Sequence, residues 1–251
     1  MCQKGDIMVN RPKMILFDYG QTLIYQDYYN SLKGYQAIYQ YITSNPENIT
    51  PEQMNELAKK LYENCNIAFD KTSKHEWIID IKNTDIQRYI SDIYKLEYSK
   101  SLDEREIIYW DNACNGTAAD YIVQFLDYLY KSGIKTGVVS NSSFSSGALL
   151  ERLNRLIPNN HFEFVIASSD YIFRKPHPYI FQLAIVKSGF EPESIWYCGD
   201  DTVWDVEAAY KSGMFPIWYT ANLDYEQRTP IVPHLEIKNW CEVIDVLQTL
   251  K

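Results

Sequence analysis

The sequence has no long apolar run, and no stretch of it approaches the roughly 18 consecutive apolar positions of a membrane-spanning helix. Residues 1–12 mix charged and polar side chains with few apolar ones, so we expect no signal peptide. Cysteine is scarce: the five cysteines are scattered and form no CxxC pair, which indicates reduced thiols packed as small apolar groups. Together these absences predict a cytoplasmic protein.

An excess of basic residues is absent as well. The 251 residues include 24 lysines and arginines against 33 aspartates and glutamates, a net charge of −9. A broad basic face for nucleic acid or for an anionic membrane is therefore not expected. Hydrophobic residues make up 46% and charged residues 23% of the chain, which excludes a mostly disordered chain, a collagen-like repeat and a coiled coil. A folded domain is expected, and nothing in the sequence indicates an oligomeric state.

Short apolar runs alternate with helical patterns along much of the chain. The first run, residues 14–17, ends abruptly at Asp18 and a glycine turn, as a buried strand feeding a loop does. Comparable runs lie at residues 136–140, 164–167, 195–199 and 215–219. Strands that alternate with helices predict an α/β fold, in which a doubly wound, Rossmann-like parallel sheet is covered on both faces.

Residues 25–115 show a different pattern, with apolar positions at helical spacing and no strand-like run. Thr50 is a predicted N-cap, followed by Pro51 at the first helical position and a capping-box Gln53. An apolar stripe on one helix face is expected to pack in the core; it consists of Tyr28, Leu32, Tyr35, Tyr39 and Ile42. The sequence thus predicts a core domain of residues 1–24 and 116–251 with a helical domain inserted at 25–115.

Four predicted strand ends are polar or are followed closely by polar residues. They are Asp18-Tyr19-Gly20-Gln21-Thr22, Ser140-Asn141-Ser142, Arg174-Lys175-Pro176, and Gly199-Asp200-Asp201 with Asp205 following. Ligands bind beyond the carboxyl ends of parallel strands, so these groups should converge in space. Asp18, Asp200 and Asp205 would repel one another in one crevice unless a hard cation neutralised them. Magnesium suits such oxygen ligands, whereas no histidine or cysteine cluster suits zinc.

The same residues favour phosphoryl chemistry. One oxygen of Asp18 can coordinate the metal while the other attacks phosphorus. Ser140 and the backbone N–H groups around Asn141 would donate hydrogen bonds to phosphoryl oxygens, and the ammonium of Lys175 would stabilise the charge of the transition state. The expected catalytic residues are Asp18, Ser140 and Lys175, and the expected phosphate-binding residues are Ser140, Asn141 and Lys175.

In order and spacing, the four groups resemble the motifs of the haloacid dehalogenase-like hydrolase superfamily, in the subgroup with a helical cap inserted just after the first motif. The resemblance extends from residue 14 to residue 219. It implies a magnesium-dependent hydrolase of small phosphorylated metabolites that acts through an aspartyl-phosphate on Asp18. It also implies a metal site formed by Asp18, the carbonyl of Gly20, Asp200 and Asp205.

Gly20 is a departure from that family pattern. Phosphatases of the family usually carry a second acid two residues after the nucleophile, which protonates the leaving group and then activates water. Glycine has no such group, and the loss of a positioned acid or base typically costs about 10²- to 10⁴-fold in rate. Tyr19, Gln21, a cap residue or an ordered water are candidate substitutes, although glutamine is no acid at neutral pH and Tyr19 points away from Gly20 in an extended chain. A substrate with a good leaving group would need little acid.

Two alternatives to a conventional phosphatase stay open at this level. The first is a weakly active or inactive protein that binds or senses phosphate. The second is a phosphonatase-like enzyme, which the resemblance links to a cap lysine that forms a Schiff base. Candidate lysines are Lys33, Lys59, Lys60, Lys71, Lys74, Lys82, Lys95 and Lys100. Dehalogenation, which needs no metal, is disfavoured because Asp200 and Asp205 predict a metal site.

Overall fold

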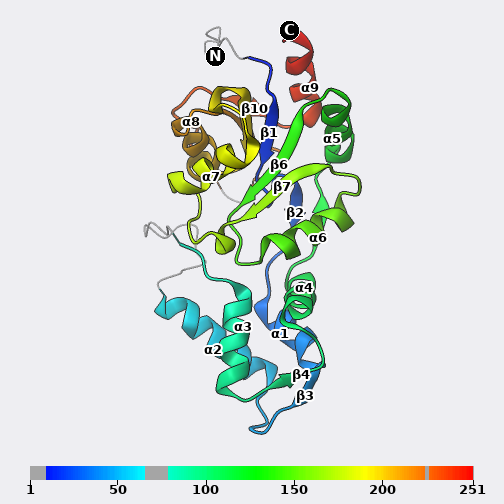
Figure 1. The fold of residues 1–251 in the computed structure, drawn as a ribbon, viewed down its shortest axis with the longest axis vertical. Coiled ribbons are helices and arrows are strands. Elements are labelled where there is room, and N and C mark those ends of the chain that lie inside the picture. The colour runs from blue at the N-terminus through cyan, green and yellow to red at the C-terminus, as the bar shows by residue number, and fades with distance from the viewer. Residues whose placement is uncertain (1–9, 66–78, 224–225, 251) are drawn as a thin grey trace.

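The computed structural model describes residues 10–65, 79–223 and 226–250. These residues form an α/β core and a separate group of helices at the end of the molecule opposite to both termini (Figure 1). Within the described residues, no helix is long and apolar enough to span a bilayer.

A six-stranded, entirely parallel sheet forms the centre of the core. Its strand order is β10-β9-β8-β1-β6-β7. In chain order the strands are β1 (Met14–Phe17), β6 (Lys135–Ser140), β7 (Phe162–Ala167), β8 (Ile195–Gly199), β9 (Phe215–Tyr219) and β10 (Leu235–Ile237). The chain builds the sheet first on one side of β1 and then on the other, so β1 lies at the point where the strand order reverses. That is where ligands bind in open α/β sheets.

Helices cover both faces of this sheet, as expected for alternating strands and helices. They are α5 (Ile122–Lys131), α6 (Ser146–Leu156), α7 (Pro178–Ser188), α8 (Ala208–Lys211) and α9 (Trp240–Thr249). In β1, Ile15 and Phe17 pack in the core cluster that includes side chains of α5, α6 and α9. Met14 and Leu16 point the other way and pack with α7 and α8. The predicted α/β fold is confirmed.

Helix α5 begins only at Ile122. The preceding residues form strand β5 (Gly116–Ala118), which pairs antiparallel with β2 (Ile24–Gln26). Tyr121 then adopts a left-handed conformation that precedes the helix. At the other end, Gly133 has a φ of +70°, the left-handed conformation expected of a glycine just past a helix.

The helical group lies between β2 and β5. It consists of α1 (Ser31–Tyr39), α2 (Pro51–Asn64), α3 (Asn83–Ile93) and α4 (Leu102–Ala113), with the short antiparallel strands β3 (Ile42–Ser44) and β4 (Glu97–Tyr98). The capping box of Thr50 and Gln53 is present at the start of α2. The expectation that this segment contains no strand is wrong, because β3 and β4 pair with each other.

The apolar stripe predicted in this segment is only partly correct. Asn30 caps α1, so the helix begins at Ser31 and excludes Tyr28, which is 91% exposed. Tyr35 is buried as expected, whereas Ile42 lies in β3 instead of on the helix. The stripe joins residues of a loop, a helix and a strand, and the spacing alone does not reveal these boundaries.

The chain enters and leaves the helical group through neighbouring strands. Tyr25 pairs with Thr117 and Gln26 pairs with Gly116 in the β2–β5 ribbon. The expected domain boundaries, at residues 24/25 and 115/116, fall in and beside this ribbon and stay a prediction.

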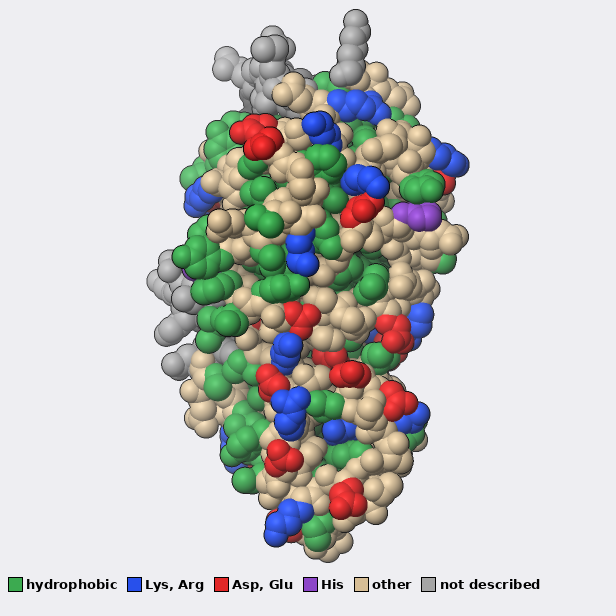
Figure 2. All heavy atoms as spheres, in the orientation of Figure 1, with side chains coloured by type: hydrophobic (Ala, Val, Ile, Leu, Met, Phe, Trp, Pro, Cys, Tyr) green, Lys and Arg blue, Asp and Glu red, His purple; other side chains and the backbone are tan. Residues whose placement is uncertain are grey.

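Acidic and basic side chains lie next to one another where the helical group meets the core on the face shown in Figure 2.

Candidate active site

A buried ion pair lies at the carboxyl end of β1. Asp18 follows the strand directly, and its backbone N–H donates to the carbonyl of Cys198 in neighbouring β8 at 2.8 Å. Nζ of Lys175 lies 2.6 Å from Oδ1 of Asp18, and the Lys175 side chain is only 3% exposed. The sheet therefore places a carboxylate and an ammonium together at the strand end where ligands are expected.

Asp205 is the second carboxylate that holds this lysine. Its Oδ1 lies 2.6 Å from Nζ of Lys175 and accepts from the hydroxyl of Tyr197 at 3.2 Å. Its Oδ2 accepts from the backbone N–H of Asp201 at 3.0 Å. A Cβ added to Gly199 would lie 2.3 Å from Cγ of Asp205, so glycine is needed there to admit the carboxylate.

Burial and charge act in opposite directions on these groups. Burial raises the pKa of Asp205 to about 7, although the nearby Lys175 charge opposes that rise. Burial by itself would lower the pKa of Lys175, but the charges of Asp18 and Asp205 outweigh it and raise the pKa above its ordinary value. Lys175 is therefore an ammonium at neutral pH, fixed between the side chains of Asp18 and Asp205.

Asp200 completes a buried acidic triad with Asp18 and Asp205. One carboxylate oxygen from each of the three lies within 4.8 Å of the others, and all three residues are buried. Asp200 follows β8, and its carbonyl accepts from the indole N–H of Trp218 at 2.9 Å. Three carboxylates facing a single ammonium leave a negative site of oxygen donors, a donor set that suits a hard cation.

Asn141 fixes the loop that carries Lys175. Its side-chain amide donates to the carbonyl of Lys175 at 2.9 Å and accepts from the Lys175 backbone N–H at 2.7 Å. Ser140, the last residue of β6, is buried and lines the same cavity as Asp18. The Asn141 side chain therefore holds the loop that carries Lys175. Phosphate binding by the backbone N–H groups around Asn141 stays a prediction.

The surroundings of Gly20 exclude one proposed substitute for the missing acid. The hydroxyl of Tyr19 accepts from Nε of Arg152 at 2.9 Å. Burial raises the pKa of Tyr19 to about 12, although Arg152 opposes the shift. Tyr19 therefore points to the α6 side. A Cβ added to Gly20 would instead lie 2.7 Å from Oε1 of Gln26, and the sequence patterns gave no signal for Gln26.

These side chains open into a cavity of about 1100 Å³ between the core and the helical group. The core lines it with Asp18, Ser140, Asn141, Lys175, Asp200 and Asp205, and the helical group lines it with Asn55, Lys59, Tyr62, Tyr109 and Trp110. Trp110 stacks on Phe144 of the core with ring centroids 4.2 Å apart. Aromatic rings of the helical group thus form a wall of the cavity.

Polar contacts hold the helical group against the core around this cavity. Nη1 of Arg174 lies 3.3 Å from Oδ1 of Asp80, and Asp80 also contacts the hydroxyl of Ser168. Glu106 of α4 accepts from the backbone N–H of Ser145, the N-cap of α6, at 2.8 Å. The cavity is therefore walled by two groups of elements that contact each other directly.

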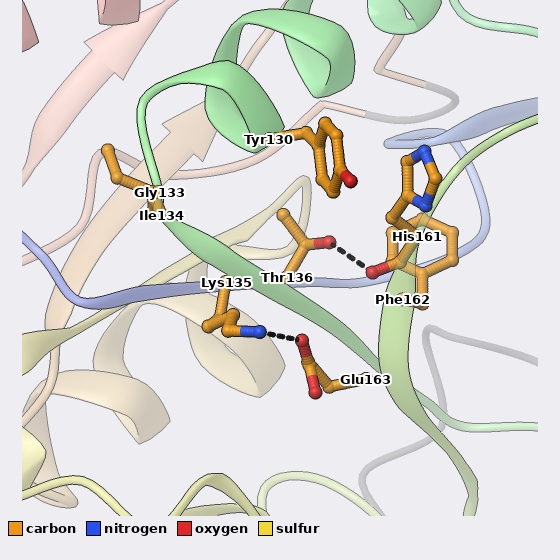
Figure 3. Close-up of a pocket in the computed structure, with 8 residues that line it drawn as sticks. All are labelled: Tyr130, Gly133, Ile134, Lys135, Thr136, His161, Phe162 and Glu163. Atoms are coloured by element: carbon orange, nitrogen blue, oxygen red, sulfur yellow. Dashed lines mark hydrogen bonds and ion pairs between the residues drawn. The ribbon is translucent and has the colours of Figure 1, made fainter.

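A second, smaller hollow lies at the opposite edge of the sheet. It is lined by the end of α5, by the amino ends of β6 and β7 and by the residues just before these strands. The rings of Tyr130 and His161 stack there with centroids 4.1 Å apart (Figure 3). Lys135 pairs with Glu163 beside them. This hollow is remote from the carboxyl strand ends where Asp18 and Lys175 meet.

The sequence pattern of the haloacid dehalogenase-like hydrolases matches residues 15–219. This match covers most of the chain, including the elements that carry all four polar strand ends. The protein therefore belongs to the haloacid dehalogenase-like hydrolase family, and the family resemblance seen in the sequence is confirmed. The subgroup with an inserted helical cap stays a prediction.

Two curated relatives match part of the chain. Glyceraldehyde 3-phosphate phosphatase of Pyrococcus furiosus is 31% identical over 104 residues, which cover 40% of this chain and 42% of that protein. The protein of the same name from Methanopyrus kandleri is 31% identical over 135 residues, covering 51% and 56%. The chain thus spans about half the length of the curated relatives it matches.

A solved structure resembles the protein over nearly its whole length. The 2-haloacid dehalogenase of Pseudomonas syringae pv. Tomato DC3000 superimposes with a TM-score of 0.64 at 19% identity, covering 96% of this chain and 99% of that chain. At this identity the likeness shows a shared fold.

Proposed function

We propose that this hydrolase is a magnesium-dependent phosphatase of small phosphorylated metabolites that acts through an aspartyl-phosphate. The observation that carries the proposal is the buried arrangement of Asp18, Lys175 and the Asp18–Asp200–Asp205 triad at the carboxyl end of the central strand. The names of the two curated relatives, both phosphatases, support the same reaction class.

The donor set fits a magnesium ion. The carboxylates of Asp18, Asp200 and Asp205 are hard oxygen ligands within reach of one another, and the carbonyl of Gly20 is the proposed fourth protein ligand. When bound, magnesium neutralises the clustered carboxylates and polarises a phosphoryl oxygen.

The chain's own groups have distinct proposed roles. Oδ of Asp18 forms a bond to phosphorus, and the bond between phosphorus and the leaving-group oxygen breaks, with its electron pair departing on that oxygen. Lys175, fixed by Asp205 and by the Asn141 side chain, stabilises the charge on the phosphoryl oxygens. The hydroxyl of Ser140 and the backbone N–H groups around Asn141 bind these oxygens. Water then hydrolyses the aspartyl-phosphate.

The helical group is the proposed cap over this site. Its aromatic side chains form one wall of the cavity and exclude water from the reacting groups. The cavity, at about 1100 Å³, is slightly larger than the roughly 300–1,000 Å³ of ordinary ligand pockets. A small phosphorylated metabolite therefore fits, and glyceraldehyde 3-phosphate is a natural first probe.

A phosphonatase-like reaction is the second candidate, because Lys59 of α2 lines the cavity. Schiff-base lysines are typically desolvated in apolar pockets, whereas Lys59 is exposed. Borohydride trapping with a phosphonated aldehyde tests this candidate. A covalent adduct that is lost in Lys59→Arg would favour it over the phosphatase.

Hydrolysis of glyceraldehyde 3-phosphate, 4-nitrophenyl phosphate and acetyl phosphate tests the proposed function directly. We expect turnover that requires magnesium and is abolished in Asp18→Asn, while the exposed-site control Asp127→Asn keeps it. Magnesium-dependent phosphate binding without turnover would instead identify a binding or sensing protein. Full activity in Asp18→Asn would remove the proposed nucleophile.

A further inference from the structure

Gln26 covers the face of Gly20 where the expected acid would project. It is the last residue of β2, and its backbone is fixed by pairing with Gly116 of β5. Its Oε1 lies 2.7 Å from the position of a Cβ on Gly20. Gln26 lines the same cavity as Asp18 and Lys175. A carboxamide thus lies beside the position where other phosphatases of the family place a carboxyl group.

Cys114 orients the carboxamide. Nε2 of Gln26 donates to Sγ of Cys114 at 3.8 Å. The single S–H of Cys114 has two carbonyl acceptors within reach, those of Asp27 and Asn115, each 3.3 Å from Sγ, and burial raises the pKa of this thiol. With its nitrogen engaged by sulfur, the amide presents its oxygen to the cavity side of Gly20.

We propose that Oε1 of Gln26 positions the water that attacks the aspartyl-phosphate; this inference rests on the proposed function. An amide oxygen accepts a hydrogen bond but takes no proton at neutral pH. Glutamine orients the attacking water in this way in P-loop GTPases. Gln26 therefore supplies the orienting half of the missing acid's role without its proton transfer.

The hydrolytic step then balances without a base at this position. The water oxygen forms a bond to phosphorus, and the bond between phosphorus and the Asp18 oxygen breaks with its electron pair returning to the carboxylate. Oε1 of Gln26 accepts a hydrogen bond from the water as the bond forms, and the proton released by the water passes to phosphate or solvent. Because glutamine does not ionise, the pH dependence of this step in the wild type should show no titration from residue 26.

Pre-steady-state hydrolysis of 4-nitrophenyl phosphate by the full chain with magnesium tests the inference. Nitrophenol release reports phosphorylation of Asp18, and the following linear phase reports dephosphorylation. Gln26→Ala should slow the linear phase about 10-fold or more, leave the burst rate unchanged and raise the fraction of acid-quenched phosphoenzyme. Gln26→Glu should accelerate dephosphorylation and add a rise in its rate as the new carboxyl group ionises.

Controls separate this inference from the proposed function. Gln124→Glu, on an exposed face of α5, makes the same chemical change outside the cavity and should keep both phases. Wild-type dephosphorylation rates and pH profiles in both Gln26→Ala and Gln26→Glu would overturn the role of Gln26 alone. A wild-type chain that forms no phosphoenzyme on Asp18 would overturn the proposed function and this inference together.

Discussion

The ammonium of Lys175 contacts Oδ1 of Asp18 at 2.6 Å, although 157 residues separate them along the chain. The contact is buried, and Asp205 holds the same ammonium from the other side. Removing the cation would leave two carboxylates facing each other in a region of low dielectric. The lysine therefore has a structural role in addition to its proposed chemical one.

Lys175→Ala should lose both stability and activity. Breaking a buried ion pair by removing one partner costs about 3–5 kcal/mol, so the urea midpoint should fall clearly. Turnover should drop by roughly 10²- to 10³-fold. Lys187→Ala, on the last turn of α7, is the matched control and should retain both properties. Unchanged activity in Lys175→Ala would contradict its proposed role.

Gly20→Asp should raise the hydrolysis of esters with poor leaving groups, by about 10-fold or more. The new Cβ meets only the end of the Gln26 side chain, which can rotate away without backbone movement. Gly20→Asn adds the same volume without an ionisable group and should give no such gain. The comparison of alkyl and aryl phosphates measures the effect, and equal gains in both variants would refute a proton-transfer role at residue 20.

Magnesium should stabilise the folded protein in the absence of substrate. A ligand that binds only the folded state at 100 times its Kd adds about 2.7 kcal/mol, and here it also relieves repulsion within the acidic triad. Thermal unfolding with increasing magnesium should therefore show a rising midpoint. Asp200→Asn should weaken this response, and the same rise in Asp200→Asn as in the wild type would argue against Asp200 as a ligand.

Asp170 predicts an acid-dependent loss of stability. Burial would raise its pKa, but hydrogen bonds from Ser146 and the charge of Lys82 outweigh burial and hold the pKa below the ordinary value of 3.8. A carboxylate whose pKa is lower in the folded state than in the unfolded state stabilises the protein at pH values above the unfolded-state pKa. That contribution is lost as the pH falls from the unfolded-state pKa through the folded-state pKa. Urea midpoints from pH 5 to pH 3 should fall less steeply in Asp170→Asn than in Asp127→Asn, and equal slopes would contradict the shift.

The strands and the convergence of the polar strand ends were accessible from the sequence. Buried parallel strands are short apolar runs, and their carboxyl ends share one edge of the sheet. Asp18, Ser140, Lys175 and Asp200 could therefore be expected to line a common cavity, as they do. The local apolar pattern locates the strands, and the geometry of a parallel sheet brings their polar ends together.

Contacts made by residues outside those patterns could not be predicted. The approach of Gln26 to Gly20 depends on the turn between them and on the pairing of β2 with β5, a strand 90 residues further along the chain. The glutamine itself has no distinctive local pattern. The pairing of Tyr19 with Arg152 likewise depends on how α6 packs against the first loop. The start of α1 was missed because a cap at Asn30, and not the apolar spacing, sets its boundary.

The antiparallel ribbon of β2 and β5 holds the two ends of the inserted segment side by side. Because the chain enters and leaves this segment through two paired strands, the segment between them can be replaced by another. The core is then still joined to the same two strands, β2 and β5. Gln26 belongs to that ribbon, so a graft that preserves residues 24–26 and 116–118 would replace the helical group while retaining the amide beside Gly20.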